Sequence, residues 1–263
     1  MGAFDTQTSR DLEFNAIRTL LLGYCHNPTA QERAQNLKPF RNRKRMVRAL
    51  EETKEFLQIR RESIPFPAVG CDEIHREIER LNIRESVLSE PQFMRLRVAS
   101  ETINDVVAAL QGRDSINPRL FYLLRNVKAT TELIDPIDKV FDTKGSVRSN
   151  ASAKLVTIRE DMIRVRRSIN RQFIKSLKDC AERGWLADTK EGFINDRRVL
   201  SINSTHKRKV PGTVLGQSNN GSITFIEPAV NISLNFEMEM LRDDERKEIL
   251  RILRDLKQGI RKH

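Results

Sequence analysis

Two long rows of apolar residues, separated by a short stretch of a different pattern, constrain this fold more than any other feature of the sequence. In each row the apolar residues recur mostly at spacings of three and four, as on one face of an α-helix. Charged residues occupy the other faces, so each row resembles a coiled-coil-like seam. Because each helix can bury the row that the other exposes, we expect the two helices to pair antiparallel. The first row is Leu155, Ile158, Met162, Val165, Ile169, Phe173, Leu177 and Cys180, and the second is Leu234, Met238, Leu241, Ile249, Ile252 or Leu253, Leu256 and Ile260.

The stretch between the two rows, residues 193–228, is the one clearly β-like part of the chain. It contains two pairs of apolar segments, joined by Asn195-Asp196 in the first pair and by Ser218 to Gly221 in the second. The second connection ends in Asn-Gly, the strongest short hairpin signal. Pro211 cannot donate a hydrogen bond to a sheet, so we expect it at the start of a strand or at an edge. The pattern predicts a compact β-rich insert made of hairpins.

The part of the chain before the first row indicates a helical domain. Residues 11–24 have the pattern of one amphipathic helix, and a capping box from Thr29 to Glu32 predicts the start of another. Ser89 is a candidate N-cap for a helix that ends at Leu110. The predicted fold class is therefore mainly α: a helical core domain over 1–141, an outgoing long helix over 142–192, a β-rich insert over 193–228 and a returning long helix over 229–263.

The charge of the chain favours a polyanionic partner. The formal net charge is +11 and the pI is about 9.9, and each phosphate that a protein neutralises releases condensed counterions. Within the β-rich insert the basic residues outnumber the acidic ones. The alternative interpretation, a solvated basic loop, applies to many such segments. We expect phosphate contacts from Lys207, Arg208, Lys209, Arg197 and Arg198.

No catalytic constellation or metal site is recognisable in the sequence. The four histidines lie far apart, and neither HExxH nor a Cys/His ligand spacing occurs. Cys25, Cys71 and Cys180 are scattered and odd in number, which favours free thiols in a reducing, cytoplasmic compartment. No apolar run approaches the length that crosses a bilayer, so no membrane partner is expected. The sequence therefore offers no catalytic site, and it leaves open whether the protein is an enzyme.

Several short motifs of the chain resemble those of one known family. Lys207-Arg208-Lys209, Gln217-Ser218 and the run from Phe225 to Pro228 are similar to the corresponding stretch of the second bacterial MutS paralogue. The order and spacing of these motifs extend the resemblance over nearly the whole chain. Further matches are Gly145-Ser146-Val147, Ala151-Ser152, Leu155, Ile158-Arg159, Gly212, Gly221, Asn235, Leu241 and Glu245-Arg246, with weaker ones at Leu12-Glu13-Phe14 and Glu101 to Asp105.

The resemblance implies a fold and a function. Members of this family are MutS-type ATPases with an associated endonuclease activity, in which long lever helices carry a clamp that grips a duplex between two subunits. The chain would then be an N-terminal core, lever and clamp portion, working as a homodimer in the full-length protein. The P-loop motif GxxxxGK[ST] does not occur in it. ATP and Mg²⁺ are thus implied only for an ATPase domain outside this sequence, and no cofactor is expected for the chain itself.

Three functions stay open at this level. The first is backbone contact with duplex or branched DNA in recombination control or repair. The second keeps the fold but directs the basic tip to ribosomal RNA of stalled ribosomes, with which the family is also associated. The third is a protein-interaction module whose helices pair with another chain.

The chain also departs from the family pattern. Ile223-Thr224 stands where the family has a hydroxyl residue followed by an apolar one, Gly216 replaces a commonly acidic residue, and Phe236 replaces an asparagine. Exchanging the apolar and hydroxyl residues at 223 and 224 leaves open which of the two side chains is buried.

Overall fold

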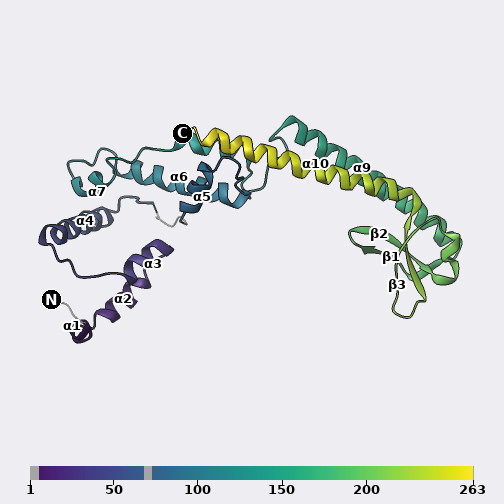
Figure 1. The fold of residues 1–263 in the computed structure, drawn as a ribbon, viewed down its shortest axis with the longest axis horizontal. Helices are drawn as coiled ribbons and strands as arrows, with labels where there is room; N and C mark the ends of the chain where they lie inside the picture. Colours follow the sequence, from purple (N-terminus) through teal and green to yellow (C-terminus); the bar gives the residue numbers. More distant parts are fainter. Residues whose placement is uncertain (1–5, 68–72, 263) are drawn as a thin grey trace. The chain divides into compact units, whose positions relative to one another are not determined.

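The computed structural model describes residues 6–67 and 73–262, and these are mainly helical with one small antiparallel sheet. This confirms the predicted class, mainly α with a small β insert. The chain divides into two compact units: one runs to Val147 and resumes at Leu253, and the other runs from Arg148 to Ile252. Figure 1 labels the elements. The helices are α1 Thr6–Asp11, α2 Phe14–Leu22, α3 Pro28–Gln35, α4 Arg43–Arg61, α5 His75–Asn82, α6 Glu90–Leu110, α7 Pro118–Leu123, α8 Thr131–Val140, α9 Ala153–Glu182 and α10 Ala229–Ile260.

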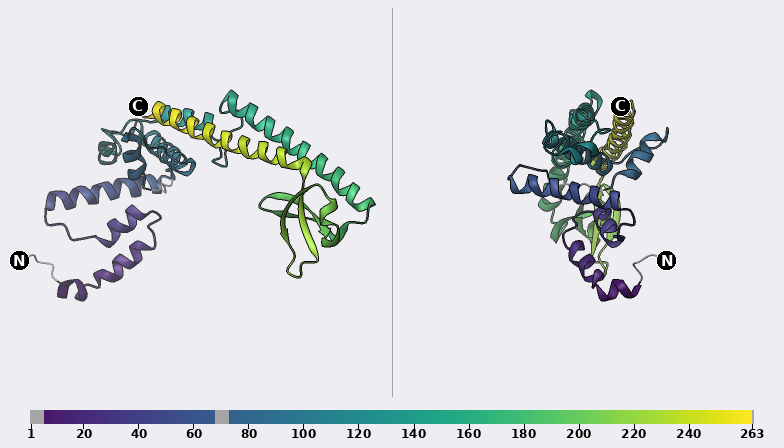
Figure 2. Two further views of the ribbon diagram at one scale, coloured as in Figure 1. Left: turned by 45° about the vertical axis from the view of Figure 1, so that its right-hand side comes forward. Right: turned by 90° about the vertical axis from the view of Figure 1, so that its left-hand side faces the viewer.

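In the second unit, α9 and the first part of α10 run side by side in opposite directions (Figures 1 and 2). Three contacts give the direction: Ser152 donates to Glu248, Arg159 to Glu245, and Asn231 to the backbone oxygen of Ile169. Residues early in α9 therefore meet residues late in this part of α10. Within this unit, Leu155, Ile158, Val165, Phe173 and Cys180 of the first predicted row are buried, and so are Met238 and Ile252 of the second.

The helix α9 ends earlier than the sequence pattern predicted. Its last residue is Glu182, not residue 192, and strand β1 already begins at Leu186. Gly184 between them adopts a φ of 68°, a left-handed conformation that terminates helices and that glycine adopts without a Cβ clash. The polar run from Asp188 to Glu191 resembles a solvated helix in sequence, but it belongs to β1, which pairs with β2 at Leu186 and Glu191 and has an irregular register between them.

The sheet has four antiparallel strands in the order β1-β2-β4-β3. Asn195 and Asp196 connect β1 to β2 with φ values of 50° and 62°, the left-handed pair typical of a two-residue hairpin turn. Pro211 directly precedes the edge strand β3, as predicted. The strands are β1 Leu186–Ile194, β2 Arg197–Asn203, β3 Gly212–Gln217 and β4 Ile223–Pro228, and the 3-10 helix η1, Ser204–Lys209, lies between β2 and β3.

One apolar cluster holds the sheet against the C-terminal half of α9. Phe173 and Cys180 of α9 pack with Leu200 and Ile202 of β2 and with Ile226 of β4. All five side chains are at least 95 % buried. Burial of such side chains is the main favourable term in folding, so this cluster fixes the sheet on the helix within the second unit.

The structure decides the orientation of the exchanged pair at 223 and 224. Thr224 is fully buried, whereas Ile223 is partly exposed. The hydroxyl of Thr224 lies 2.8 Å from that of Ser204 at the start of η1. A buried hydroxyl needs a partner, and Ser204 supplies it.

In the first unit, α6 and α8 pack together around aromatic and charged contacts. The rings of Phe93 and Phe141 lie 5.7 Å apart, and the guanidinium of Arg97 donates to Asp138. Ser89 caps α6, as the sequence predicted, and forms a capping box with Gln92.

The ammonium of Lys257, which is 97 % buried, donates to the backbone oxygen and hydroxyl of Ser86 at 2.8 and 2.9 Å. Its burial lowers the pKa of Lys257.

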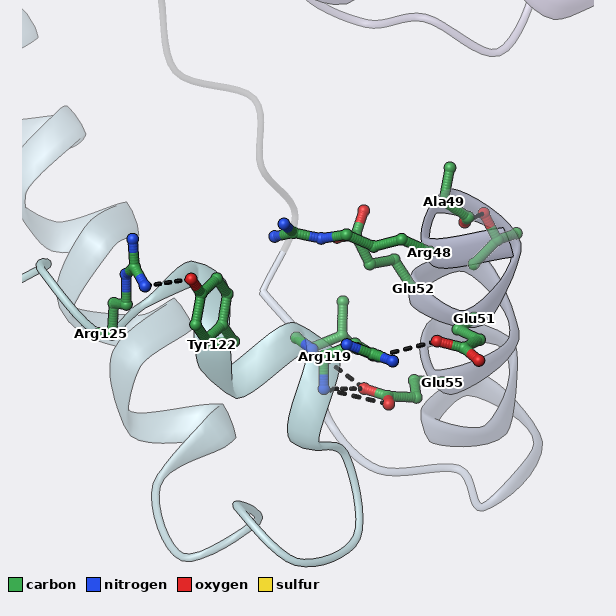
Figure 3. A network of polar contacts seen from close by, with 10 residues as sticks. Arg48, Ala49, Glu51, Glu52, Glu55, Arg119, Tyr122 and Arg125 are labelled. Carbon is green, nitrogen blue, oxygen red and sulfur yellow. Dashed lines mark hydrogen bonds and ion pairs between the residues drawn. The ribbon is translucent and has the colours of Figure 1, made fainter. Parts of the chain in front are cut away.

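A carboxylate from α4 caps α7 (Figure 3). Glu55 accepts hydrogen bonds from the backbone N–H groups of Arg119 and Leu120, at 2.9 to 3.1 Å. These N–H groups have no partner inside the helix, and the positive end of the helix dipole favours an anion there. The side chain of Arg119 in turn donates to Glu51 at 2.8 Å. The contact joins α4 to α7 through polar groups.

Two predictions for the N-terminal helices were wrong in detail. Residues 11–24 do not form one helix, because Glu13 adopts a φ of 51° and separates α1 from α2. The cap of α3 is not Thr29 but Asn27, whose side chain accepts a hydrogen bond from the backbone N–H of Ala30.

Cys25 and Cys180 are free thiols, and Cys71 lies outside the described residues. Among the helices that are described, none is long and apolar enough to cross a membrane.

Candidate nucleic-acid interface

Three consecutive cations, Lys207, Arg208 and Lys209, form the end of η1, and all three are exposed. A 3-10 helix turns by one third of a revolution per residue, so consecutive side chains point in three different directions. Lys209 lies over the ring of Trp185, 6.0 Å from its centroid. Within residues 6–67 and 73–262, no carboxylate pairs with Lys207 or Arg208. These two side chains are therefore available to an external anion.

The start of η1 is fastened to the loop between β3 and β4. The hydroxyl of Ser204 donates to the backbone oxygen of Gly221 at 2.6 Å, and its backbone N–H donates to Ser222 at 2.9 Å. The hairpin signal at Asn220-Gly221 thus also positions the basic helix. A short segment held at its first residue presents its cations from a defined place on the sheet.

Trp185 makes this surface aromatic as well as basic. The guanidinium of Arg183 lies 5.0 Å from its ring centroid, and the ring of His206 lies 6.3 Å away. Sequence reasoning missed this residue, although it is the single tryptophan of the chain and follows Gly184 directly. Its ring packs partly on the apolar cluster of the sheet, so the protein interior fixes its position among the cations.

The other two predicted contact residues, Arg197 and Arg198, lie elsewhere. They begin β2, whereas η1 follows its end, and a seven-residue strand separates its ends by roughly 20 Å. Arg198 is bound to Glu191 through contacts of 2.7 to 3.1 Å. The structure thus groups Lys207, Arg208 and Lys209, and it pairs the two arginines with carboxylates of the chain itself.

Arg197 belongs to a polar network around the buried carboxylate of Glu227 that the sequence analysis did not find. Its guanidinium donates to Glu227 at 2.9 Å and to Glu239 at 2.7 Å. Hydrogen bonds to Glu239 and then to Glu227 raise the pKa of Arg197. Asn235 donates to the other oxygen of Glu227 at 2.6 Å. The sequence showed only that Glu227 stands at the end of a predicted strand. It did not show that Arg197 and Asn235 would lie beside its carboxylate.

The residues present do not fit the cofactors of an ATPase. The sequence lacks a P-loop, and no group of three or more His, Cys, Asp or Glu residues in the described part of the chain is arranged to hold a metal ion. No step of ATP hydrolysis is therefore assigned to these residues. What the arrangement can do is bind phosphate groups through exposed cations.

The chain is similar to long bacterial proteins over nearly all of its residues, although no protein-family model matches it. It is 23 % identical over 254 residues to the endonuclease MutS2 of Aquifex aeolicus, which is 95 % of this chain and 32 % of that protein. It is 30 % identical over 253 residues to the endonuclease MutS2 of Clostridium beijerinckii, which is 94 % of this chain and 31 % of that protein. The endonuclease MutS2 of Clostridium perfringens is 30 % identical over 251 residues, with the same shares. The chain thus spans about a third of the length of the curated relatives it matches.

Proposed function

This chain is a relative of the MutS2 endonucleases over nearly its whole length, and we propose that it is the part of a MutS-type protein that grips nucleic acid. The partner is DNA, duplex or branched, and the contacts are made to its phosphate backbone. Contacts of this kind position a protein on a duplex without reading its sequence. The biological role would be control of recombination or DNA repair.

The observation that carries the proposal is the row of exposed cations at the end of η1. Lys207 and Arg208 have no carboxylate partner among the described residues, and Lys209 contacts only the ring of Trp185 there. Arg197 and Arg198 are less available, because each is bound to carboxylates of the chain. We therefore assign the main phosphate contacts to Lys207, Arg208 and Lys209, and a weaker contribution to the two arginines of β2.

The pairing of α9 with α10 supports a mechanical role for these helices. The contacts that link α9 to α10, Ser152 to Glu248 and Arg159 to Glu245, support the proposal that the two helices act as one rod, which would transmit motion applied at its end. We propose that the helices act as a lever for the sheet and that two copies of the full-length protein close around the nucleic acid. Much of the grip would then come from closure of the two copies.

The test compares two charge reversals of equal size. In the first variant, Lys207, Arg208 and Lys209 are replaced by Glu. In the control variant, Arg43, Lys44 and Arg45 are replaced by Glu, since these are also three consecutive exposed cations, at the start of α4. We expect the first variant to lose affinity for branched and duplex DNA in a full-length protein, and the control to keep it. Equal affinities of the two variants would contradict the proposal.

The same pair of variants separates DNA from ribosomal RNA as the target. A cationic surface binds either polymer, so co-sedimentation with ribosomes is measured beside DNA binding at the same salt concentration. Loss of DNA binding with unchanged co-sedimentation supports DNA as the partner of η1. The reverse result would assign the surface to ribosomes, and a discrete protein complex formed without nucleic acid would favour a protein-interaction module.

A further inference from the structure

A second candidate site lies in the same unit, between α9, the turn that joins β1 to β2, and α10. It is a cavity of about 530 Å³, within the range of about 300–1,000 Å³ typical of small-molecule pockets. Figure 1 shows these elements within the second unit, with β1 and β2 below α9 and α10. Its lining includes Arg166, Arg167, Phe193, Asn195, Met238 and Arg242.

The cavity carries cations that no described residue neutralises. Five arginines line it, and two of these, Arg197 and Arg198, are bound to carboxylates of the chain. Arg242 lies 4.0 Å from the carboxylate of Asp196, at the outer limit of an ion pair. Arg166 and Arg167 on α9 have no hydrogen bond or ion pair to any residue in the described ranges. The guanidinium group suits phosphate, which it can bind through two parallel hydrogen bonds.

The same cavity contains an exposed aromatic ring. Phe193 at the end of β1 is 73 % exposed, although residues of this type are usually buried. Met238, which also lines the cavity, is 94 % buried and supplies an apolar wall. Asn195 in the adjoining turn adds an amide that can both donate and accept. A planar ring can stack on Phe193 while its polar edge reaches amide groups.

We propose that this cavity binds a nucleotide unit, with the phosphate at Arg166, Arg167 and Arg242 and the base stacked on Phe193. The unit can be a free mononucleotide or one unpaired nucleotide of a strand, which present the same chemistry. A duplex does not suit the cavity, because its bases are stacked inside and only its backbone is accessible. The proposal does not depend on phosphate contacts at η1, which lies beyond the opposite end of β2.

The first experiment measures binding of three probes to the full chain by titration calorimetry at low salt: AMP, adenosine and inorganic phosphate. Because base and phosphate each contribute, we expect AMP to bind about tenfold or more tightly than adenosine or phosphate. A single-stranded oligonucleotide, titrated at the same salt, distinguishes the two sources. Tighter binding of AMP supports a free ligand, and tighter binding of the strand supports an unpaired nucleotide.

Matched variants then locate the binding. Arg166→Glu and Phe193→Ser should each weaken the tighter-binding probe by about tenfold. Two controls change exposed residues of the same types that do not line the cavity: Arg171→Glu on α9 and Phe236→Ser on α10. These should leave the affinity unchanged. Circular dichroism confirms that all four variants fold.

Two results would overturn the proposal. One is the absence of binding of AMP and of the strand alike, and the other is an equal loss of affinity in the cavity variants and their controls. The variant with Glu at 207, 208 and 209 keeps its affinity for AMP if the cavity is the site. Failure of the proposed DNA contact at η1 is therefore distinguishable from failure of this proposal.

Discussion

The guanidinium of Arg197 lies 2.9 Å from the carboxylate of Glu227, and Glu227 is 99 % buried whereas the side chain of Arg197 is 30 % exposed. The pair links the start of β2 to the end of β4, directly before α10 begins. Asn235 of α10 binds the same carboxylate. One buried acid thus joins two strands and a helix at the point where the sheet continues into α10.

Replacing the two partners should have unequal effects on stability. Arg197→Met leaves the buried carboxylate with Asn235 alone, and we expect a loss of about 3 kcal/mol in the free energy of unfolding. Glu227→Gln keeps one oxygen for Arg197, and its amide N–H can donate to the side-chain oxygen of Asn235 once that amide rotates, so the loss should be about 1 kcal/mol. Urea unfolding of both variants measures the difference. A larger loss for Glu227→Gln would contradict this account.

The free energy of unfolding of the second unit should depend on pH because Glu248 titrates with a lowered pKa. Hydrogen bonds from Arg251 and then Ser152 lower the pKa of Glu248 to about 2, from an ordinary value of 4.5, and burial opposes this shift. Because the folded-state pKa is the lower one, the stabilisation is complete above pH 4.5 and is lost as the pH falls towards 2.

A shift of this size corresponds to at most about 3 kcal/mol, and screening at the half-exposed Arg251 reduces the expected value to about 1–2 kcal/mol. Glu248→Gln removes this titration. The difference in unfolding free energy between the parent chain and this variant should therefore shrink between pH 5 and pH 2.5 by about that amount. A constant difference across the range would show that Glu248 is not held by these bonds.

The salt dependence of nucleic-acid binding should report how many phosphates the cations of η1 neutralise. If Lys207, Arg208 and Lys209 each neutralise one phosphate, their replacement by Ala makes the slope of log K against log salt shallower by roughly 2.7 on duplex DNA. Alanine at Arg43, Lys44 and Arg45 provides the control. Fluorescence anisotropy at four or five salt concentrations gives both slopes, and parallel lines for the two variants would exclude phosphate contact at η1.

A methyl group at Gly212 should destabilise the sheet although the residue is exposed. A Cβ atom there would lie 2.1 Å from the backbone oxygen of Glu227 and 2.8 Å from a methyl group of Ile226. Gly212→Ala therefore forces β3 away from β4, and we expect a loss of about 2 kcal/mol. At Gly216 the nearest atom would lie at 3.4 Å, so Gly216→Ala should change stability by less than about 0.5 kcal/mol. Thermal unfolding of both variants tests the contrast.

The regular elements were predictable where local chemistry decides the conformation. The apolar rows at Leu155 to Cys180 and Leu234 to Ile260 follow one face of a helix, so their period could be read directly. Asn195-Asp196 carries its turn signal in two neighbouring residues. The cap at Ser89 likewise depends on atoms within one turn.

The start of β1 was not predictable for the opposite reason. Residues 186–192 contain a run of charges that suits a solvated helix surface, but they belong to a strand that pairs with β2 at Leu186, Glu191 and Gly192, with an irregular register between Leu186 and Glu191. The orientation of Thr224 likewise depends on Ser204, which is brought close by the fold. In both cases the deciding partner is distant in sequence.

For the candidate sites, too, the sequence showed some features and the structure alone showed others. The basic run at 207–209 is visible in the sequence because three charges stand side by side, and its contact with phosphate remains a prediction. The availability of each cation was not visible. Arg197 and Arg166 look alike in the sequence, yet one is bound to two carboxylates and the other to none among the described residues.

The sequence by itself indicated a resemblance to the MutS2 proteins through short motifs. It also predicted the two long helices and the compact β insert between them, because periodicity and turn residues act over a few positions. Only the tertiary structure decided that β1 begins at Leu186, that Glu227 is buried, and which arginines have no carboxylate partner among the described residues. Glu227 and Glu239, for example, bind Arg197 from 30 and 42 positions away, and no local pattern encodes such a distance.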